Sequence, residues 1–384
     1  MTKTFLREKL IVCMPLFPLI DFFVFSEIPV FTFASYLLTF FVFKKNVIKC
    51  DINIFLFILI SITSCMINSI QKGIGGEEIK YLVALLFFSF MGATIGKKLE
   101  YYLEALVKMV VFYFVLNTMI YMYRLIAYEF DFNRVRSGIS IFGGNTVHFI
   151  YLMVLFVLKK YTCRKKEYYL ILVLSVINAV MFVSKGAILL AVAWVLLDIV
   201  NQKKTHILNK KSIMFVGILT VSIVPLLKDK LGVFIKYIVE RFNIWGQLYN
   251  STGSIWGTRG KIFEFTTEYI KNNPLVILWG NGPSNFRDIN PWGYSNPHNL
   301  LLDVFIDLGI VGLFVFFAMC LCIIMKSKNK IYFLACICYA IFEGISLFYI
   351  DSSSSIVAGF VFLFIIICYY DSKERYRTES LLKY

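Results

Sequence analysis

His298 and Asn299 stand next to each other in the stretch SNPHNLLLDVF, where a long apolar run begins. Proline is favoured at the first position of a helix, so Pro297 predicts a helix that starts here, with Asn296 as its N-cap and His298 in its first turn. The first turn of a helix presents unpaired N–H groups and a positive potential, which favour a bound phosphate and a neutral imidazole. The pattern predicts either an anion site with a histidine that can accept a proton, or a histidine that only caps a helix.

Basic residues elsewhere in the chain would complete such an anion site. Arg259 lies at the start of TRGKIFEFTTEYIKNNP, which predicts a helix over residues 258–274 that ends at Asn-Asn-Pro. Lys185 lies in VSKGAILL, at a break between two apolar runs, and Arg136 precedes SGISIFGGN. A guanidinium can bind two phosphate oxygens at once, so a lipid diphosphate would suit these residues. The alternative is that each long basic side chain simply extends to the membrane surface. Three further arginines of interest are Arg124, Arg241 and Arg287.

Acidic residues interrupt the apolar sequence at a few places. Asp303 and Asp307 are one helical turn apart and share a face with Asn299. Glu343 lies inside an apolar run, where an ionisable residue is a candidate for function. We weigh two roles for Glu343: a contact to substrate, or an ion pair with Lys185 or Arg124.

Other motifs predict no cofactor and no metal. The stretch WGNGPSNF has a GxG pattern but lacks the third glycine of a dinucleotide-binding loop, so we interpret it as a flexible turn that faces sugar. Two pairs of cysteines, 320/322 and 336/338, have a spacing that points their side chains to nearly opposite faces of a helix. Tryptophans near this turn could stack on sugar rings or form an interfacial aromatic belt.

The composition shows which elements must position these residues. The chain is 59% hydrophobic and 16% charged, whereas soluble domains are about 45–50% apolar and about 25% charged. A helix needs about 20 apolar residues to cross a bilayer. The sequence therefore predicts an all-α, polytopic integral membrane protein with about twelve transmembrane helices. The predicted spans are 9–25, 28–43, 52–70, 79–96, 105–127, 141–158, 168–184, 186–200, 212–227, 298–325, 331–349 and 354–370.

The distribution of positive charge predicts the orientation. Most of the 39 basic residues fall in alternate connections, as in KKYTCRKK at 159–166 and KKTHILNKK at 203–211. Basic residues are enriched on the cytoplasmic side of membrane proteins. Twelve spans with both termini in the cytoplasm satisfy this rule, so the net charge of +15 reflects topology and not nucleic-acid binding.

One predicted connection is much longer than the others. Residues 228–296 follow the ninth span and lie on the outer, periplasmic side of a single membrane domain that covers 1–384. Loops of this length are usually functional or disordered, and the aromatic content argues against disorder. Arg241, Arg259 and Arg287 all lie within it.

Two neighbouring stretches, TRGKIFEFTTEYIKNNPLVILWGNGPSNF and SNPHNLLLDVFIDLGIVGLF, resemble the signature of the bacterial O-antigen polymerase and O-antigen ligase superfamily. The shared pattern is an arginine that opens an outer helix, a proline and a GxG-like turn, a His-Asn pair, and a helix with acid-x-G-x-x-G. In this chain the pattern falls on Arg259, Pro274, Gly280, Gly282, His298, Asn299, Asp307, Gly309 and Gly312. VSKGAILL resembles the Ser-Arg-Gly turn of the family, with Lys185 in place of arginine.

The resemblance implies a metal-independent membrane glycosyltransferase of the C type, in the bacterial inner membrane. It would transfer a glycan from an undecaprenyl-diphosphate carrier to an acceptor hydroxyl. His298 and Arg259 are the implied catalytic residues, as base and as diphosphate ligand. The implied substrate-binding residues are Lys185, Arg136, Asn299, Arg287, Arg241 and Glu343.

Three functions are compatible with this resemblance and topology. The first is an O-antigen or capsular polysaccharide polymerase, which joins lipid-linked repeat units in lipopolysaccharide biosynthesis. The second is a ligase that transfers the finished glycan to lipid A core, and the third is a flippase for the lipid-linked oligosaccharide. The compact size and the short distance in sequence from Arg259 to His298 favour the polymerase. A flippase and a chain-length regulator would be its partners, together with the bilayer.

Overall fold

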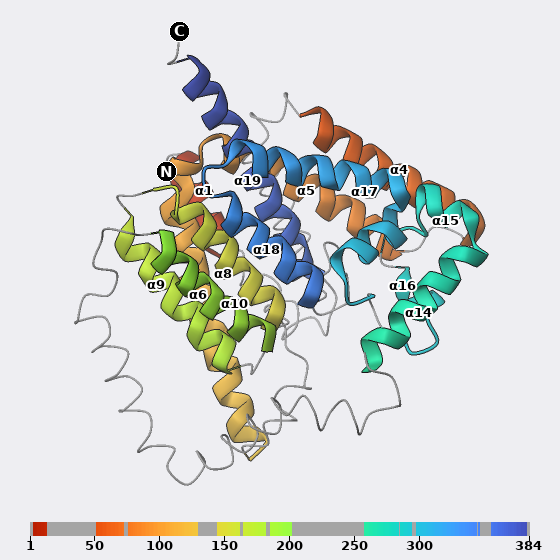
Figure 1. The fold of residues 1–384 in the computed structure, drawn as a ribbon, viewed down its shortest axis with the longest axis horizontal. Helices are drawn as coiled ribbons and strands as arrows, with labels where there is room; N and C mark the ends of the chain where they lie inside the picture. Colours follow the sequence, from red (N-terminus) through yellow and green to blue (C-terminus); the bar gives the residue numbers. More distant parts are fainter. Residues whose placement is uncertain are drawn as a thin grey trace.

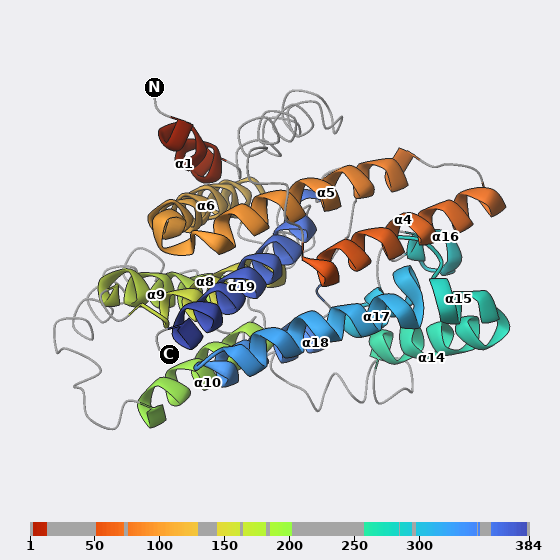
Figure 2. The same cartoon turned by 90° about the horizontal axis from the view of Figure 1, so that it is seen from above.

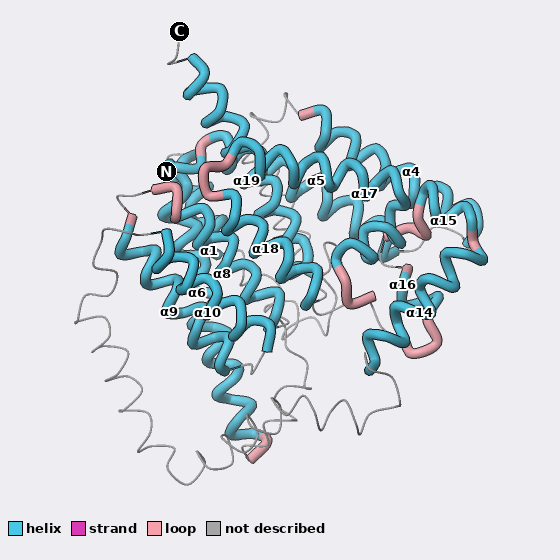
Figure 3. Tube along the Cα trace, in the orientation of Figure 1, coloured by secondary structure: helices cyan, strands magenta, loops and turns pink. Residues whose placement is uncertain are grey.

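The computed structural model describes residues 3–13, 51–72, 76–129, 144–161, 164–181, 185–201, 257–283, 285–293, 297–343, 345 and 355–381. Within these ranges every regular element is a helix, as Figure 3 shows. The helices are α1 Lys3–Cys13, α4 Ile52–Lys72, α5 Gly76–Lys97, α6 Leu99–Ala127, α8 Gly144–Leu158, α9 Lys165–Met181, α10 Lys185–Asn201, α14 Gly257–Asn272, α15 Pro274–Trp279, α16 Phe286–Ile289, α17 Leu300–Lys326, α18 Lys330–Glu343 and α19 Ser355–Leu381.

The described helices include three that are long and apolar enough to cross a membrane, at 52–70, 99–127 and 300–326. Shorter apolar helices cover 81–97, 148–158 and 186–198. These segments coincide with six of the predicted spans, and they are consistent with a membrane protein. The predicted spans at 28–43 and 212–227 lie outside the described residues, as do most of the span at 9–25 and residues 228–256 of the long connection.

Two helices lie at the centre of the bundle. Residues 148–158 of α8 and 361–370 of α19 are buried on every side, with no side chain more than 3% exposed. A helix that is apolar all round is expected to be surrounded by other helices. In Figures 1 and 2, α19 passes between the group α6, α8, α9 and α10 and the group α4, α5 and α17.

Glycines allow α5 and α19 to pack closely. A Cβ atom added at Gly92 would lie 2.7 Å from Cγ2 of Ile366, and one at Gly96 would lie 2.6 Å from the carbonyl oxygen of Ile367. The two glycines are four residues apart, so they share one face of α5. This small-xxx-small spacing is typical of helix packing in membranes.

Buried ion pairs join the helices at the end of the bundle that the charge pattern assigns to the cytoplasm. Asp198 of α10 is 2% exposed and accepts hydrogen bonds from Lys159 and from the hydroxyl of Tyr332, the latter at 2.7 Å. Lys160 forms a second pair, with its Nζ 2.6 Å from a carboxylate oxygen of Asp371. The two lysines that follow α8 are thus neutralised by acids from α10 and α19.

Candidate functional site

His298 lies just before α17 and has an unusual backbone conformation. Its φ angle is +52°, in the left-handed region that few residues other than glycine adopt. Asn299 is the N-cap of α17, because its side-chain oxygen accepts hydrogen bonds from the backbone N–H groups of Leu301 and Leu302 at 3.0 and 3.2 Å. The predicted helix start was therefore wrong by several residues: Asn296 is not the N-cap, and His298 precedes the helix. Pro297 does not set the helix start, because Asn299 stands closer to the apolar run and caps the helix there.

The helix that follows His298 is broken at Gly309. Gly309 has φ +68° and ψ −170°, which divides α17 into residues 300–308 and 310–326. The break leaves the carbonyls of Ile306 and Asp307 without their usual helical donors. Their replacements come from elsewhere: Asn281 N–H donates to Ile306 at 2.6 Å, and Gly282 N–H donates to Asp307 at 3.2 Å. The sequence did not predict this break, because the residues on both sides of Gly309 belong to one apolar run.

The glycine turn at 280–282 is the part of the chain that fits into the break. A Cβ atom at Gly280 would lie 2.2 Å from the carbonyl oxygen of Asp307, and one at Gly309 would lie 2.2 Å from the carbonyl oxygen of Leu278. The two backbones are therefore in direct contact. Asn281 and Gly282 are buried, so the prediction of a flexible turn that faces sugar was wrong. The glycines serve close packing and a positive φ instead.

A small hydrophobic cluster fixes α14 and α16 on the first half of α17. Ile262 of α14, Phe286 of α16 and Ile306 of α17 are each at most 1% exposed and pack together. The structure confirms the predicted helix at 258–274, since α14 covers Gly257–Asn272. Arg259 stands three residues before Ile262, so its backbone is about one turn from this cluster. The unit of α14, α15 and α16 lies at the end of the molecule away from both termini (Figures 1 and 2).

Three aromatic side chains of this unit lie together. The Tyr269 hydroxyl donates to the side-chain oxygen of Asn281 at 3.0 Å, and burial raises the pKa of Tyr269 above its ordinary value. Phe265 stacks on Tyr269 and meets the edge of Trp292, which is 46% exposed. An exposed aromatic ring of this kind can stack on a sugar. Arg287, on α16, is also exposed.

Glu343 lies at a second position, where α18 ends beside the start of α10. A Cβ atom at Gly186 would lie 1.7 Å from Oε1 of Glu343. Glycine at this position therefore makes room for the carboxyl group against the first turn of α10. Lys185 is the first residue of α10, and its backbone adjoins this contact. The structure thus places Glu343 beside the start of α10, where the sequence analysis considered an ion pair with Lys185.

The two aspartates of α17 lie where this helix packs against α4 and α5. Asp303 and Asp307 are each 3% exposed, and both are close enough to Tyr81 of α5 to interact electrostatically with it. The Ser64 hydroxyl of α4 donates to the carbonyl oxygen of Asp307 at 2.8 Å. These acids therefore belong to the packing of α17 on α4 and α5.

The sequence analysis did not identify one buried histidine as a candidate. His148 of α8 is 0% exposed, and its Nδ1 is 3.2 Å from the hydroxyl of Ser175 on α9. The ring meets the edge of Tyr339, one turn before Glu343 on α18. The sequence signal was weak, since His148 stands inside an apolar segment with no neighbouring charge.

The structure does not describe the side chains of several predicted site residues. Arg136 and Arg241 lie outside the described residues, and the side chains of Lys185 and Arg259 do as well. The structure therefore fixes where the backbones of Lys185 and Arg259 lie. Over the described ranges, no three histidine, cysteine, aspartate or glutamate side chains come together as metal ligands.

Residues 146–317 match the family model of O-antigen ligase. The match covers less than half of the chain and includes the stretches that resemble the O-antigen polymerase and ligase superfamily. Members of this family are membrane glycosyltransferase-like enzymes. The matched residues include α8 to α10, the unit of α14 to α16, and the first part of α17 with His298. No curated protein matches the sequence of this chain. Glu343 and Arg136 lie outside the match.

The residues near the start of α17 offer a base and an exposed aromatic ring. A partly exposed imidazole precedes a capped helix, and an exposed aromatic ring and an exposed arginine lie on the adjoining unit. An imidazole can accept a proton from a hydroxyl, whereas the N–H groups of Leu301 and Leu302 in the first turn of α17 already donate to Asn299.

Proposed function

We propose that this protein is an O-antigen or capsular polysaccharide polymerase. It joins undecaprenyl-diphosphate-linked repeat units at the outer face of the bacterial inner membrane. The observation that carries the proposal is the left-handed conformation of His298 directly before the capped helix α17, whose first half packs against α14, the helix that contains Arg259. Strained backbone of this kind clusters at functional sites.

In the proposed reaction, an acceptor hydroxyl attacks the anomeric carbon of the donor sugar. His298 accepts the hydroxyl proton as the new glycosidic bond forms. The bond between the anomeric carbon and the diphosphate oxygen breaks, and the electron pair leaves with the lipid diphosphate. Arg259 and Lys185 stabilise the negative charge on this leaving group. Arg136, Arg241, Arg287 and Asn299 contact substrate.

The ligase remains the second candidate, because the matching family model is described as O-antigen ligase. The two reactions share a donor and differ in the acceptor, which is another lipid-linked repeat unit for the polymerase and lipid A core for the ligase. The flippase is less well supported, because the family match indicates group transfer and the middle of α17 beyond Gly309 is apolar.

Surface polysaccharide from a deletion strain distinguishes these functions. Loss of a polymerase leaves lipid A core with a single repeat unit, whereas loss of a ligase leaves bare core. In complementation, His298→Ala and Arg259→Ala should reproduce the deletion phenotype. Lys271→Ala, an exposed basic residue on the same helix as Arg259, should restore long chains. Bare core in the deletion strain would favour the ligase, and normal chains with both His298→Ala and Arg259→Ala would rule out this site.

A further inference from the structure

Helix α15 exposes apolar side chains, although it belongs to the connection that the sequence places outside the membrane. Leu275 and Leu278 are 58% and 49% exposed, and Ile277 is 39% exposed. Residues 272–286, which contain α15 and the glycine turn, include no charged residue. A helix that is apolar on all sides is expected to be covered by protein or by lipid. The exposed face of α15 therefore needs an apolar neighbour.

The elements on either side of α15 have a different surface. The exposed side chains of α14 and α16 include six charged ones, Lys261, Glu264, Glu268, Lys271, Arg287 and Asp288. The surface thus changes from charged to apolar after α14 and back to charged at α16. Such a change is typical of the boundary between the polar surface of a membrane and its hydrocarbon.

The contact between α15 and α17 gives the depth of α15. A Cβ atom at Gly309 would lie 2.2 Å from the carbonyl oxygen of Leu278. From Gly309, α17 continues to Lys326, at the end that the charge pattern assigns to the cytoplasm. The helix rises about 25 Å over this distance, whereas the hydrocarbon is about 30 Å thick. The contact therefore lies about 5 Å inside the outer boundary of the hydrocarbon, and any tilt of α17 would place it deeper.

Helix α4 gives a second measure of this depth. The Ser64 hydroxyl donates to the carbonyl oxygen of Asp307 at 2.8 Å, and the same oxygen accepts the N–H of Gly282. Asp51, which pairs with Lys373, marks the opposite end of α4. From Asp51 to Ser64 a helix rises about 20 Å, which is again less than the hydrocarbon thickness of about 30 Å. Both membrane helices therefore place the glycine turn below the outer boundary.

The hydrogen bonds of the glycine turn are those that such a depth requires. Irregular backbone occurs in the hydrocarbon region only where protein covers it, because lipid offers no hydrogen-bond partner. Asn281 and Gly282 are buried, and their N–H groups donate to the carbonyls of Ile306 and Asp307. The exposed side chains of α15 have no polar groups to satisfy. The six residues of α15 rise about 9 Å, which is sufficient for a shallow entry into the membrane.

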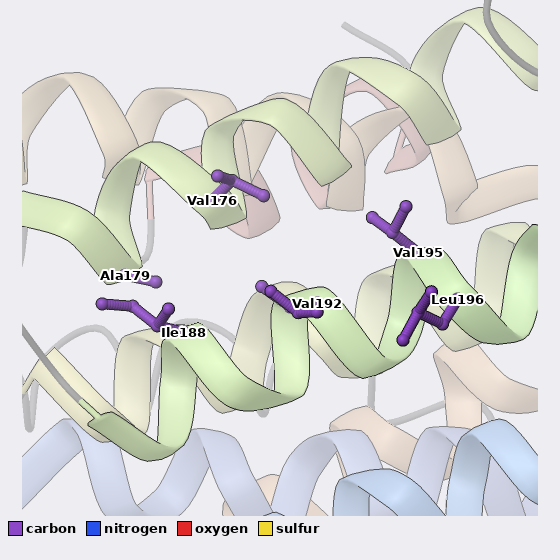
Figure 4. A pocket seen from close by; sticks show the side chains of 7 residues that line it. Val176, Ala179, Ile188, Val192, Val195 and Leu196 are labelled. Atoms are coloured by element: carbon purple, nitrogen blue, oxygen red, sulfur yellow. The ribbon is translucent and has the colours of Figure 1, made fainter.

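The face between α9 and α10 shows how a lipid-facing surface of this protein is built (Figure 4). Its lining is aliphatic, and Val192 and Leu196 are 54% and 55% exposed. The exposed leucines of α15 have the same chemistry and a similar exposure. Helix α15 also packs against α4 and α17 (Figures 1 and 2). Near the same end of α4, Met66 and Ile70 are 62% and 84% exposed, so the apolar face of α15 adjoins the lipid-facing surface of a membrane helix.

We propose that residues 274–282 form a re-entrant segment that enters the outer leaflet of the membrane. The exposed face of α15 contacts the acyl chains of phospholipids, and the glycine turn returns the chain within the protein. The connection predicted at 228–296 is therefore not wholly periplasmic, and α14, which contains Arg259, is held at the membrane surface. This assignment holds for a polymerase and for a ligase alike.

Spin labels on single cysteines measure this depth in lipid nanodiscs. The label goes on Leu278→Cys, in a background whose nine native cysteines are replaced by alanine. It should collide more often with oxygen, which concentrates in hydrocarbon, than with a water-soluble nickel chelate. Val192→Cys is the lipid-facing control and should behave in the same way, whereas Glu268→Cys on α14 should show the opposite preference. A preference for nickel at position 278 would place α15 in water, and protection from both reagents would show that protein covers it. Either result would overturn the proposal.

Photo-crosslinking in cells tests the same contact with the native cysteines in place. A diazirine amino acid at position 278 should give adducts with the mass of intact phospholipids, as the same residue at position 192 should. At position 268 lipid adducts should be lost. Exposed positions are chosen because substitutions there usually change stability by less than about 0.5 kcal/mol. Adducts to a second copy of the chain or to another protein at position 278, or lipid adducts at position 192 alone, would refute the re-entrant segment.

Discussion

Replacing Gly309 by alanine should separate the helix that carries His298 from the unit that carries Arg259. Gly309 has φ +68° and ψ −170°, a region that is essentially restricted to glycine. The added methyl group would also lie 2.2 Å from the carbonyl oxygen of Leu278. Because the obstructing atom belongs to the backbone, no change of rotamer can relieve the clash.

The size of the effect can be worked out from these contacts. Holding a residue other than glycine in this conformation costs about 1–3 kcal/mol. Releasing the strain by moving α15 away would break the hydrogen bonds from Asn281 to Ile306 and from Gly282 to Asp307, each with a net value of about 1 kcal/mol. Gly309→Ala should therefore destabilise the contact between α15 and α17 by about 2 kcal/mol, the value of the two hydrogen bonds lost when the strain is released.

Hydrogen exchange at the amides of Asn281 and Gly282 measures this contact directly. Their exchange should accelerate by at least about tenfold, since about 1.4 kcal/mol corresponds to a factor of ten. The rate of glycan transfer should also fall by about tenfold or more, because displacement of a site by about 1 Å can reduce the rate by about a hundredfold.

Gly293→Ala is the matched control for Gly309→Ala. Gly293 also has a positive φ, +66°, but nothing lies within 4 Å of an added Cβ atom. Its substitution should cost only the backbone term of about 1–2 kcal/mol and leave exchange at Asn281 and Gly282 unchanged. Unchanged exchange in Gly309→Ala, or an equal effect in both variants, would show that the contact between the two glycine backbones does not hold the unit in place.

Two further predictions concern the start of α17 and the other end of the bundle. Asn299→Ala removes the N-cap and should lower stability by about 1 kcal/mol, seen as a lower Tm, whereas Asn299→Asp should retain it; equal losses would exclude capping. At Asp51, burial alone would raise the carboxyl pKa, but hydrogen bonds from Lys373 and Tyr369 outweigh it and lower the pKa. This contribution is therefore complete above the unfolded pKa of about 4 and is lost as pH falls through the lower folded value. The Tm difference between wild type and Asp51→Asn should persist from pH 8 to about 5 and shrink below about 4; a difference that grew with acid would contradict this sign.

The limits of several helices could be predicted from sequence because their physical cause is local. A run of about 20 apolar residues must form a helix in a membrane, since its backbone groups have no other partners there. The ends of α4, α5, α9 and α10 accordingly fall within three residues of the predicted limits of 52–70, 79–96, 168–184 and 186–200. The stop signal Asn-Asn-Pro also ended α14 where expected.

The break in α17 and the position of His298 could not be predicted in the same way. Gly309 leaves the helical conformation because residues 280–282, nearly thirty positions earlier, supply donors to the freed carbonyls. Such an exchange of partners depends on tertiary contacts that no local window contains. Two asparagines flank His298, at 296 and 299. Sequence favoured the first because of Pro297, and the structure uses the second.

The most direct test of the proposed function is glycan transfer by the purified protein in lipid nanodiscs. With undecaprenyl-diphosphate-linked repeat units as donor and acceptor, the wild-type protein should form lipid-linked products two and more repeats long and release undecaprenyl diphosphate. The His298→Ala protein should have the same Tm as wild type and should form neither product. Absence of extended products with wild type, or wild-type rates with both His298→Ala and Arg259→Ala, would contradict a polymerase with its site at this end of α17.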